Sequence, residues 1–79
     1  MGIKKSEEKE RAFQELFQEN YSRLFYASFY IINNESDARD IVHDYFADLW
    51  EDFSPVTQSY TKAYLYNGVR RKSLDYLKH

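Results

Sequence analysis

Residues 36–53, SDARDIVHDYFADLWEDF, carry two helical faces of opposite character, and this stretch constrains the fold most. Apolar side chains recur there at steps of one, three and four, which places them on one side of an α-helix. They are Ala38, Ile41, Val42, Tyr45, Phe46, Leu49, Trp50 and Phe53. Carboxylates repeat on the opposite side, at Asp37, Asp40, Asp44, Asp48 and Glu51. Such a helix can bury one face in a core and present the other to a basic partner.

The preceding segment predicts a longer helix over residues 6–32. Its apolar residues keep helical spacing at Phe13, Leu16, Phe17, Tyr21, Leu24, Phe25, Phe29 and Ile32. Residues 25–32, FYASFYII, are apolar nearly all round, so we expect them to be covered on more than one side. Tyr26 and Tyr30 lie off the main apolar stripe. We expect them either to face the third helix or to remain partly exposed. Residues 1–9 are polar and predict a frayed or disordered lead-in, or the exposed first turns of this helix.

Residues 33–36, NNES, interrupt the pattern and predict a short turn between antiparallel helices. Either Asn34 or Ser36 can cap the second helix, because both side chains accept hydrogen bonds from backbone amides. Glu35 and Asp37 then lie in its first turn, where the helix dipole favours negative charge. Pro55 ends this helix near residue 53, since the residue before a proline avoids the helical conformation.

A third helix is expected over residues 59–78, with Ser59 or Thr57 as its cap. Steps of about 100° per residue divide it into two sides. The predicted buried side is Leu65, Tyr66, Val69, Ser73, Tyr76 and Leu77, with Tyr66 and Tyr76 as core aromatics. The opposite side is Tyr64, Asn67, Arg71, Leu74 and Lys78. Gly68 inside this helix costs about 1 kcal/mol relative to alanine, which suggests the close approach of another group.

Together these segments predict one compact, all-α, three-helix domain over residues 1–79. A chain of this size buries only about 60% of its unfolded surface, so large side chains are needed in the core. The six Phe, eight Tyr and one Trp supply that area. The chain has no cysteine, hence no disulfide framework, and no apolar run near the roughly 20 residues that span a bilayer. We therefore expect a soluble, cytoplasmic protein that contacts no membrane.

The net charge of −2 hides a strong asymmetry along the chain. Residues 1–34 are neutral overall, residues 35–53 carry −6, and residues 54–79 carry +4. Such a distribution suggests two surfaces with different partners, one basic and one anionic. The alternative is that neighbouring helices neutralise each other within the domain.

Two motifs resemble region 2 of the extracytoplasmic-function (ECF) sigma factors, the bacterial subunits that direct RNA polymerase to promoters. The first runs through Asp40-Ile41-Val42-His43-Asp44-Tyr45-Phe46 and Leu49-Trp50, and is similar to their region 2.2. The second is Tyr64-Leu65-Tyr66, Val69-Arg70 and Leu74-Asp75-Tyr76-Leu77-Lys78, and is similar to their region 2.4. Their order and separation also match, and with the aromatic first helix they cover nearly the whole chain.

The resemblance implies a function in transcription initiation through contact with RNA polymerase and promoter DNA. The second helix would hold the coiled coil of the polymerase β′ clamp. By position, the polymerase-binding residues would be Asp40, His43, Asp44 and Asp48. His43 stands where the family usually has Gln, and neutral histidine still offers one donor and one acceptor.

The third helix and the loop before it would engage the promoter −10 element and capture a flipped base. Basic side chains would neutralise phosphates and exposed aromatics would stack on unpaired bases. The candidate DNA-binding residues are Lys62, Tyr64, Asn67, Arg70, Arg71, Lys72 and Lys78. The capture pocket would lie at residues 54–60, beside Lys62 and Tyr64. Arg71 stands where the family has Asn, so a positively charged guanidinium group replaces an amide that can read a base edge.

The resemblance allows an anti-sigma factor as a further partner, although no residue here identifies one. Nothing in the chain resembles the second domain of the family, which reads the −35 element, so we expect an excised domain or an incomplete sigma factor. The main alternative is a helical protein-interaction module that binds no DNA. A helix-turn-helix repressor half ranks lower, because the helix before the basic one is acidic.

No catalytic or metal site is expected. Asp40 and His43 have the spacing found in carboxylate-bridged metal sites of helical bundles, but such sites need a second copy and further carboxylates. The sequence has no second Asp/Glu-x-x-His, and the first helix shows only apolar residues where the further ligands would lie. It also shows no nucleophile–base constellation or glycine-rich phosphate loop. We therefore expect a binding protein without cofactors.

Overall fold

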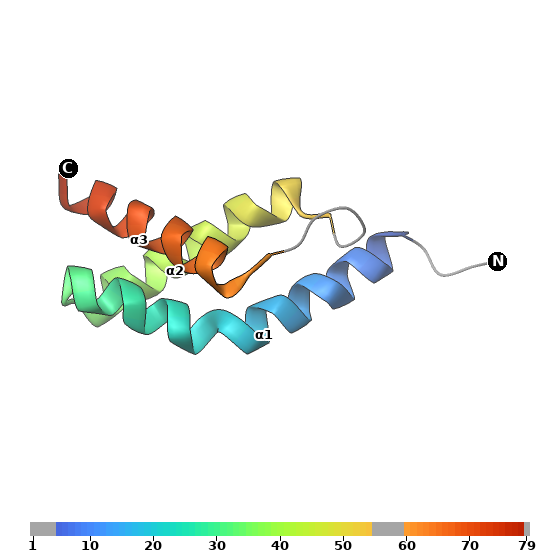
Figure 1. The fold of residues 1–79 in the computed structure, drawn as a ribbon, viewed down its shortest axis with the longest axis horizontal. Coiled ribbons are helices and arrows are strands. Elements are labelled where there is room, and N and C mark those ends of the chain that lie inside the picture. Colours follow the sequence, from blue (N-terminus) through green and yellow to red (C-terminus); the bar gives the residue numbers. More distant parts are fainter. Residues whose placement is uncertain (1–4, 55–59, 79) are drawn as a thin grey trace.

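The computed structural model describes residues 5–54 and 60–78, and these residues form three helices and no strand. Helix α1 spans Lys5–Ile32, α2 spans Glu35–Asp52 and α3 spans Lys62–Lys78. Figure 1 shows α2 running back antiparallel to α1, with α3 crossing both and running in the same direction as α1. The all-α, three-helix prediction is confirmed. Residues 5–9 form the first turns of α1, which was one of the two expectations for this segment, the other being a frayed or disordered lead-in.

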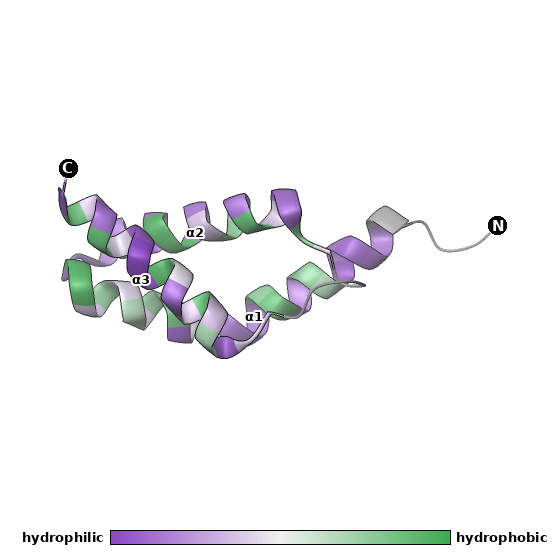
Figure 2. Ribbon diagram, turned by 45° about the horizontal axis from the view of Figure 1, so that its top comes forward, coloured by the Kyte–Doolittle hydropathy of each residue, from purple (hydrophilic) through white to green (hydrophobic). Residues whose placement is uncertain are grey.

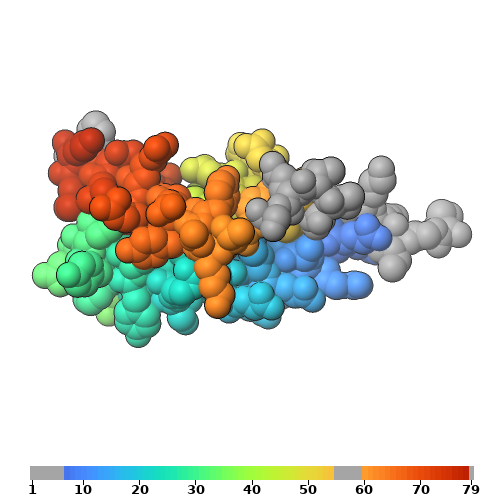
Figure 3. Space-filling model, viewed as in Figure 1, coloured from blue at the N-terminus to red at the C-terminus, as the bar shows by residue number. Residues whose placement is uncertain are grey.

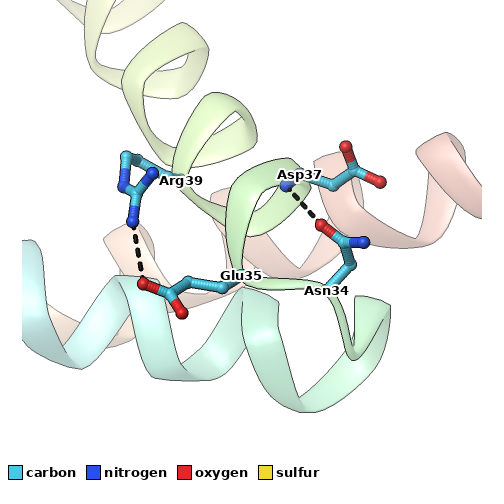
Figure 4. Close-up of polar contacts among 4 residues, drawn as sticks. All are labelled: Asn34, Glu35, Asp37 and Arg39. Atoms are coloured by element: carbon cyan, nitrogen blue, oxygen red, sulfur yellow. Dashed lines mark hydrogen bonds and ion pairs between the residues drawn. The ribbon is translucent and has the colours of Figure 1, made fainter.

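The turn between α1 and α2 takes only two residues. Asn33 adopts a left-handed conformation, with φ of 59°, and its N–H donates to the Phe29 carbonyl at 2.7 Å. Asn34 is the cap of α2, since its Oδ1 accepts from the Asp37 N–H at 2.9 Å. Figure 4 shows this cap beside an exposed ion pair between Arg39 and Glu35, 2.8 Å long. Asparagine suits both positions, because it tolerates the left-handed region and accepts amide hydrogen bonds.

Helix α3 begins later than the sequence prediction. Thr61 caps it, with Oγ1 accepting from the Tyr64 N–H at 3.0 Å and its carbonyl accepting from Leu65 at 3.1 Å. Tyr60 and Thr61 precede the helix, so the expected start at residue 59 was wrong by a turn's length. The expected caps, Ser59 and Thr57, lie outside the described residues, as does Pro55.

The core lies where all three helices meet. It is built from Leu24 of α1, Val42, Phe46 and Leu49 of α2, and Leu65 and Val69 of α3. The predicted apolar face of α2 is confirmed: six of its eight residues are buried, and Tyr45 and Trp50 are half-buried. Figure 2 shows that hydrophobic residues of α2 face the other helices and hydrophilic residues follow its outer side.

The prediction for the buried side of α3 was only half right. Leu65, Val69 and Ser73 are buried, but Tyr66, Tyr76 and Leu77 are exposed to 42%, 46% and 56%. Tyr66 and Tyr76 are therefore not core residues. A helical step of 100° gives the direction in which a side chain points, but not whether a neighbouring helix extends far enough to cover it.

A polar seam joins α1 to α3 inside the core. Ser28 and Ser73 are fully buried, with their hydroxyl oxygens 2.8 Å apart, and Ser73 Oγ also lies 2.8 Å from the Val69 carbonyl oxygen. The carbonyl can only accept, and Ser73 has one hydroxyl proton. Ser73 therefore donates to Val69, and Ser28 supplies the proton between the two hydroxyls. Both buried hydroxyls are satisfied, which avoids the cost of an unpaired polar group.

The third helix covers only part of α1. At about 1.5 Å per residue, the 28 residues of α1 extend roughly 42 Å, against about 26 Å for α3. Figure 3 shows α3, in orange and red, lying on the C-terminal part of α1, while the N-terminal turns, in blue, continue beyond it. In this N-terminal part α1 packs mainly against the end of α2. Phe13 makes edge-to-face ring contacts there with Phe46, Trp50 and Phe53, at centroid distances of 6.0, 5.0 and 5.2 Å.

Candidate functional site: two charged faces on two helices

The four residues predicted to bind polymerase are all exposed on α2. Asp40, His43, Asp44 and Asp48 project from its outer side, away from the buried Val42 and Phe46. The imidazole of His43 rests beside two rings of α1, with centroid distances of 6.2 Å to Phe17 and 5.5 Å to Tyr21. The structure thus gives His43 a fixed position at the α1 edge of the acidic face.

Two carboxylates of α2 are engaged by α3. Lys72 Nζ lies 3.1 Å from Asp48 Oδ2, and Tyr76 donates a hydrogen bond to the Asp37 carboxylate. That hydrogen bond raises the pKa of the Tyr76 phenol, and burial and the charges of Asp37 and Asp40 add to the effect. Partial neutralisation between neighbouring helices, one of the two interpretations of the charge pattern, therefore occurs at the Lys72–Asp48 ion pair. Asp40 and Asp44 take part in no ion pair within the described residues.

The candidate DNA-binding residues do not share one surface. Tyr64, Asn67, Arg71 and Lys78 line the solvent side of α3, as predicted, and all four are exposed. Lys72 instead points toward α2, where it meets Asp48. Arg70 and Lys62 are also exposed, but Lys62 lies at the end of α3 that meets α1, where its carbonyl accepts from Arg23 Nη1 at 3.5 Å. Arg70 lines a shallow hollow together with Arg71 and Lys78. The structure therefore brings five of the seven together and separates Lys62 and Lys72.

A ring cluster lies at the start of α3. Tyr60 stacks on Phe53 at 5.2 Å and meets Tyr64 edge-on at 5.7 Å. Tyr45 of α2 packs across Gly68, where an added Cβ would lie 2.5 Å from the Tyr45 ring. This explains the glycine inside the helix. Burial, together with the nearby Tyr64 and Tyr60, raises the pKa of the Tyr45 phenol to about 12.

The ring cluster borders a shallow cleft of about 460 Å³ between α2 and α3. Tyr45, Tyr60 and Tyr64 line it together with Asp48 and Asp52, whose carboxylates can accept hydrogen bonds from amino or imino groups. The sequence placed a capture pocket at residues 54–60, of which residues 55–59 lie outside the described part. It missed the contribution of Tyr45 and the two aspartates, because periodicity assigned Tyr45 to the buried face and Asp48 to the acidic face, and assigned Asp52 to neither.

A second hollow, which the sequence did not predict at all, lies between the N-terminal half of α1 and the end of α2. Its volume is about 620 Å³, and aromatic side chains form its floor. The sequence assigned Phe13 and Phe17 simply to the buried stripe of the first helix. The length of the first helix could have indicated this hollow. Because α1 is longer than α2 and α3, the rings near its N-terminal end have no third helix over them.

Comparison with known proteins identifies no relative: no family model, no curated protein and no solved structure matches this chain. Over residues 5–54 and 60–78, no group of three or more histidine and carboxylate side chains is arranged to hold a metal ion. No helix in the same part of the chain is long and apolar enough to cross a membrane.

Proposed function

We propose that this domain is a transcription-initiation module of the ECF sigma region 2 type, in which α2 binds RNA polymerase and α3 contacts promoter DNA. The proposal is supported by the resemblance of the two motifs and by the separation of charge between two exposed faces. Asp40, His43 and Asp44 are accessible on α2, while Tyr64, Asn67 and Arg71 are accessible on α3. One domain can therefore present an acidic and a basic aromatic surface at the same time.

The acidic face suits a basic helical partner, for which the resemblance suggests the β′ clamp coiled coil. Exposed charges chiefly steer association and select the partner, and their contacts weaken with salt. The basic face suits single-stranded DNA of the −10 element. Arg71 and Lys78 would neutralise phosphates, and Tyr64 would stack on a base, which contributes about 1–3 kcal/mol.

Titration of the domain with a purified β′ clamp-helix fragment tests the polymerase contact. We expect Asp40→Lys and Asp44→Lys each to weaken binding at least tenfold, because each reverses a charge at the contact. Glu15→Lys is the matched control, since it makes the same charge change at an exposed position of α1. A folded wild-type domain that does not bind, or equal losses in all three variants, would contradict the polymerase assignment.

The main alternative, a protein-interaction module without DNA binding, is favoured by the half-exposed aromatic floor between α1 and α2. Binding of the polymerase–domain complex to single-stranded −10 DNA separates the two functions. We expect salt-sensitive binding that Tyr64→Ala and Arg71→Ala weaken and Lys72→Ala affects little, because Lys72 is turned toward Asp48. Binding that ignores salt and all three substitutions would favour the alternative.

A further inference from the structure

The hollow between α1 and α2, called here the aromatic groove, is lined mainly by apolar side chains. Its floor consists of Phe13 and Phe17 from α1 and Phe46 and Trp50 from α2. Phe17 lies 4.7 Å from Phe46 and Phe13 lies 5.0 Å from Trp50, measured between ring centroids. Only Phe46 is buried, so the other three rings present apolar area to solvent. Exposed apolar patches with polar rims are typical of protein interaction sites.

The rim of the groove is acidic. Glu10 and Glu51 border it, and both are exposed without an ion pair among the described residues. The acidic face of α2 continues from the same edge through Asp40 and Asp44. Lys9 of the domain itself offsets part of this negative charge, since its Nζ lies over Trp50, 4.1 Å from the ring centre, and four carboxylates remain around the groove and along α2. The surroundings thus favour a positively charged occupant that also offers apolar side chains.

This charge decides between possible occupants. Nucleic acid and anionic lipid surfaces would be repelled by Glu10 and Glu51. A second copy of the chain would bring the same acidic rim against itself. A basic amphipathic helix satisfies both requirements, since apolar side chains on one stripe can enter a hydrophobic groove while flanking Lys and Arg face the carboxylates.

We propose that the aromatic groove receives an apolar side chain of the basic helix that docks on α2, and that it is the main source of binding energy at this contact. That this helix is one of the two helices of the β′ clamp coiled coil rests on the proposed function. Interfaces of this kind draw most of their energy from aromatic anchors in desolvated pockets, while rim charges add steering and selectivity. The interface therefore includes the N-terminal half of α1, and not α2 alone.

Ala47 provides a direct test. Its small side chain lies exposed at the mouth of the groove, so Ala47→Gln introduces a longer neutral side chain without altering the charge or a buried contact. Ala63→Gln makes the same change at an exposed position on α3 and is the matched control. Trp50 is the only tryptophan of the chain, so its fluorescence reports occupation of the groove. We expect the clamp-helix fragment to shift Trp50 emission, and Ala47→Gln to weaken binding at least tenfold while Ala63→Gln has no effect.

The two proposals fail in different ways. Binding that Asp40→Lys abolishes but Ala47→Gln leaves unchanged would keep the polymerase contact and overturn the groove. A second probe covers the case in which the clamp fragment does not bind: an 18-residue Leu/Lys amphipathic peptide, with the Leu/Glu peptide of the same pattern as its control. Trp50 emission that shifts with the basic peptide only, and does so less in Ala47→Gln, supports the groove. No shift with either the clamp fragment or the basic peptide, or an equal shift with both peptides, overturns it.

Discussion

The two ends of the molecule are packed in different ways. Where three helices meet, aliphatic and small side chains are fully buried, among them Leu24, Leu65 and Val69 beside Ser28 and Ser73. Where α1 meets only α2, large rings fill the space, and Phe13, Phe17 and Trp50 stay half-buried. With a third helix in place the side chains between the helices are fully buried, whereas between two helices alone large rings pack together and still leave a groove. The three-helix end has the fully buried core, and the two-helix end is where we propose that a partner binds.

The largest expected effect is the difference between truncations at the two ends. Leu24→Ala removes a fully buried side chain from the three-helix end and should lower the free energy of unfolding by about 2–5 kcal/mol. Phe13→Ala removes a larger side chain, but one that is half-exposed. Because less apolar area leaves water there on folding, the free energy of unfolding should fall by only about 1–2 kcal/mol. Urea denaturation followed by circular dichroism measures both. Equal costs would show that the rings stabilise the domain as much as the three-helix core.

The next effect concerns the serine seam. Ser73→Ala leaves the Ser28 hydroxyl without the partner described above, so we expect a loss of about 1–3 kcal/mol. Ser28→Ala should cost about 1 kcal/mol, because Ser73 keeps its bond to the Val69 carbonyl. The double variant should lose less than the sum, as a double-mutant cycle in urea would reveal. Strict additivity would mean that the two hydroxyls do not interact.

The smallest effect on stability is expected at Gly68 of α3, on which the Tyr45 ring of α2 packs. An alanine Cβ would lie 2.5 Å from the Tyr45 ring and must displace it, so Gly68→Ala should be neutral or slightly destabilising in the wild type. In a Tyr45→Ala background the same substitution should stabilise the domain by about 1 kcal/mol, the helix preference of alanine over glycine. Stability curves of the four proteins test this. Stabilisation in both backgrounds would show that the ring moves freely.

Alkaline titration tests the same contact between Tyr45 and Gly68 in a second way. The pKa of Tyr45 is raised in the folded state to about 12, above the ordinary value of 10. Its contribution to stability is therefore present below pH 10 and is lost as the pH rises from 10 toward 12. The Tyr45→Phe variant should lose less stability over that interval than the wild type. Gly68→Ala, by displacing the ring from its buried site, should bring the Tyr45 pKa closer to 10.

Helical periodicity predicted the three helices, the buried face of α2 and half of the buried side of α3, because a 3.6-residue repeat reports which side of a helix is apolar. It failed at Tyr66, Tyr76 and Leu77, where the direction was right but the neighbouring helix does not cover the side chain. For the same reason the aromatic groove was not predicted, since the repeat says nothing about how far one helix extends beyond another.

The candidate site was predicted as a set of residues but not as a surface. The solvent side of α3 followed from helical steps, and Asp40, His43 and Asp44 are accessible as expected. The pairing of Lys72 with Asp48 depends on how α2 and α3 are placed side by side, which no local pattern encodes. The cap at Thr61 shows a similar limit: three Ser or Thr residues lie within five positions, and each can cap a helix equally well by sequence.

The two-residue turn at Asn33 and Asn34 also affects how the chain reaches this structure. Ser28 and Ser73, which join α1 to α3, are 45 positions apart, whereas α1 and α2 are separated only by the turn. The entropy lost in closing a loop rises with the logarithm of its length, so pairing of α1 with α2 restricts the chain least. The α1–α2 hairpin is a local unit that contains the whole acidic face and the aromatic groove. The basic face, in contrast, is positioned only once the most distant segment of the chain has docked.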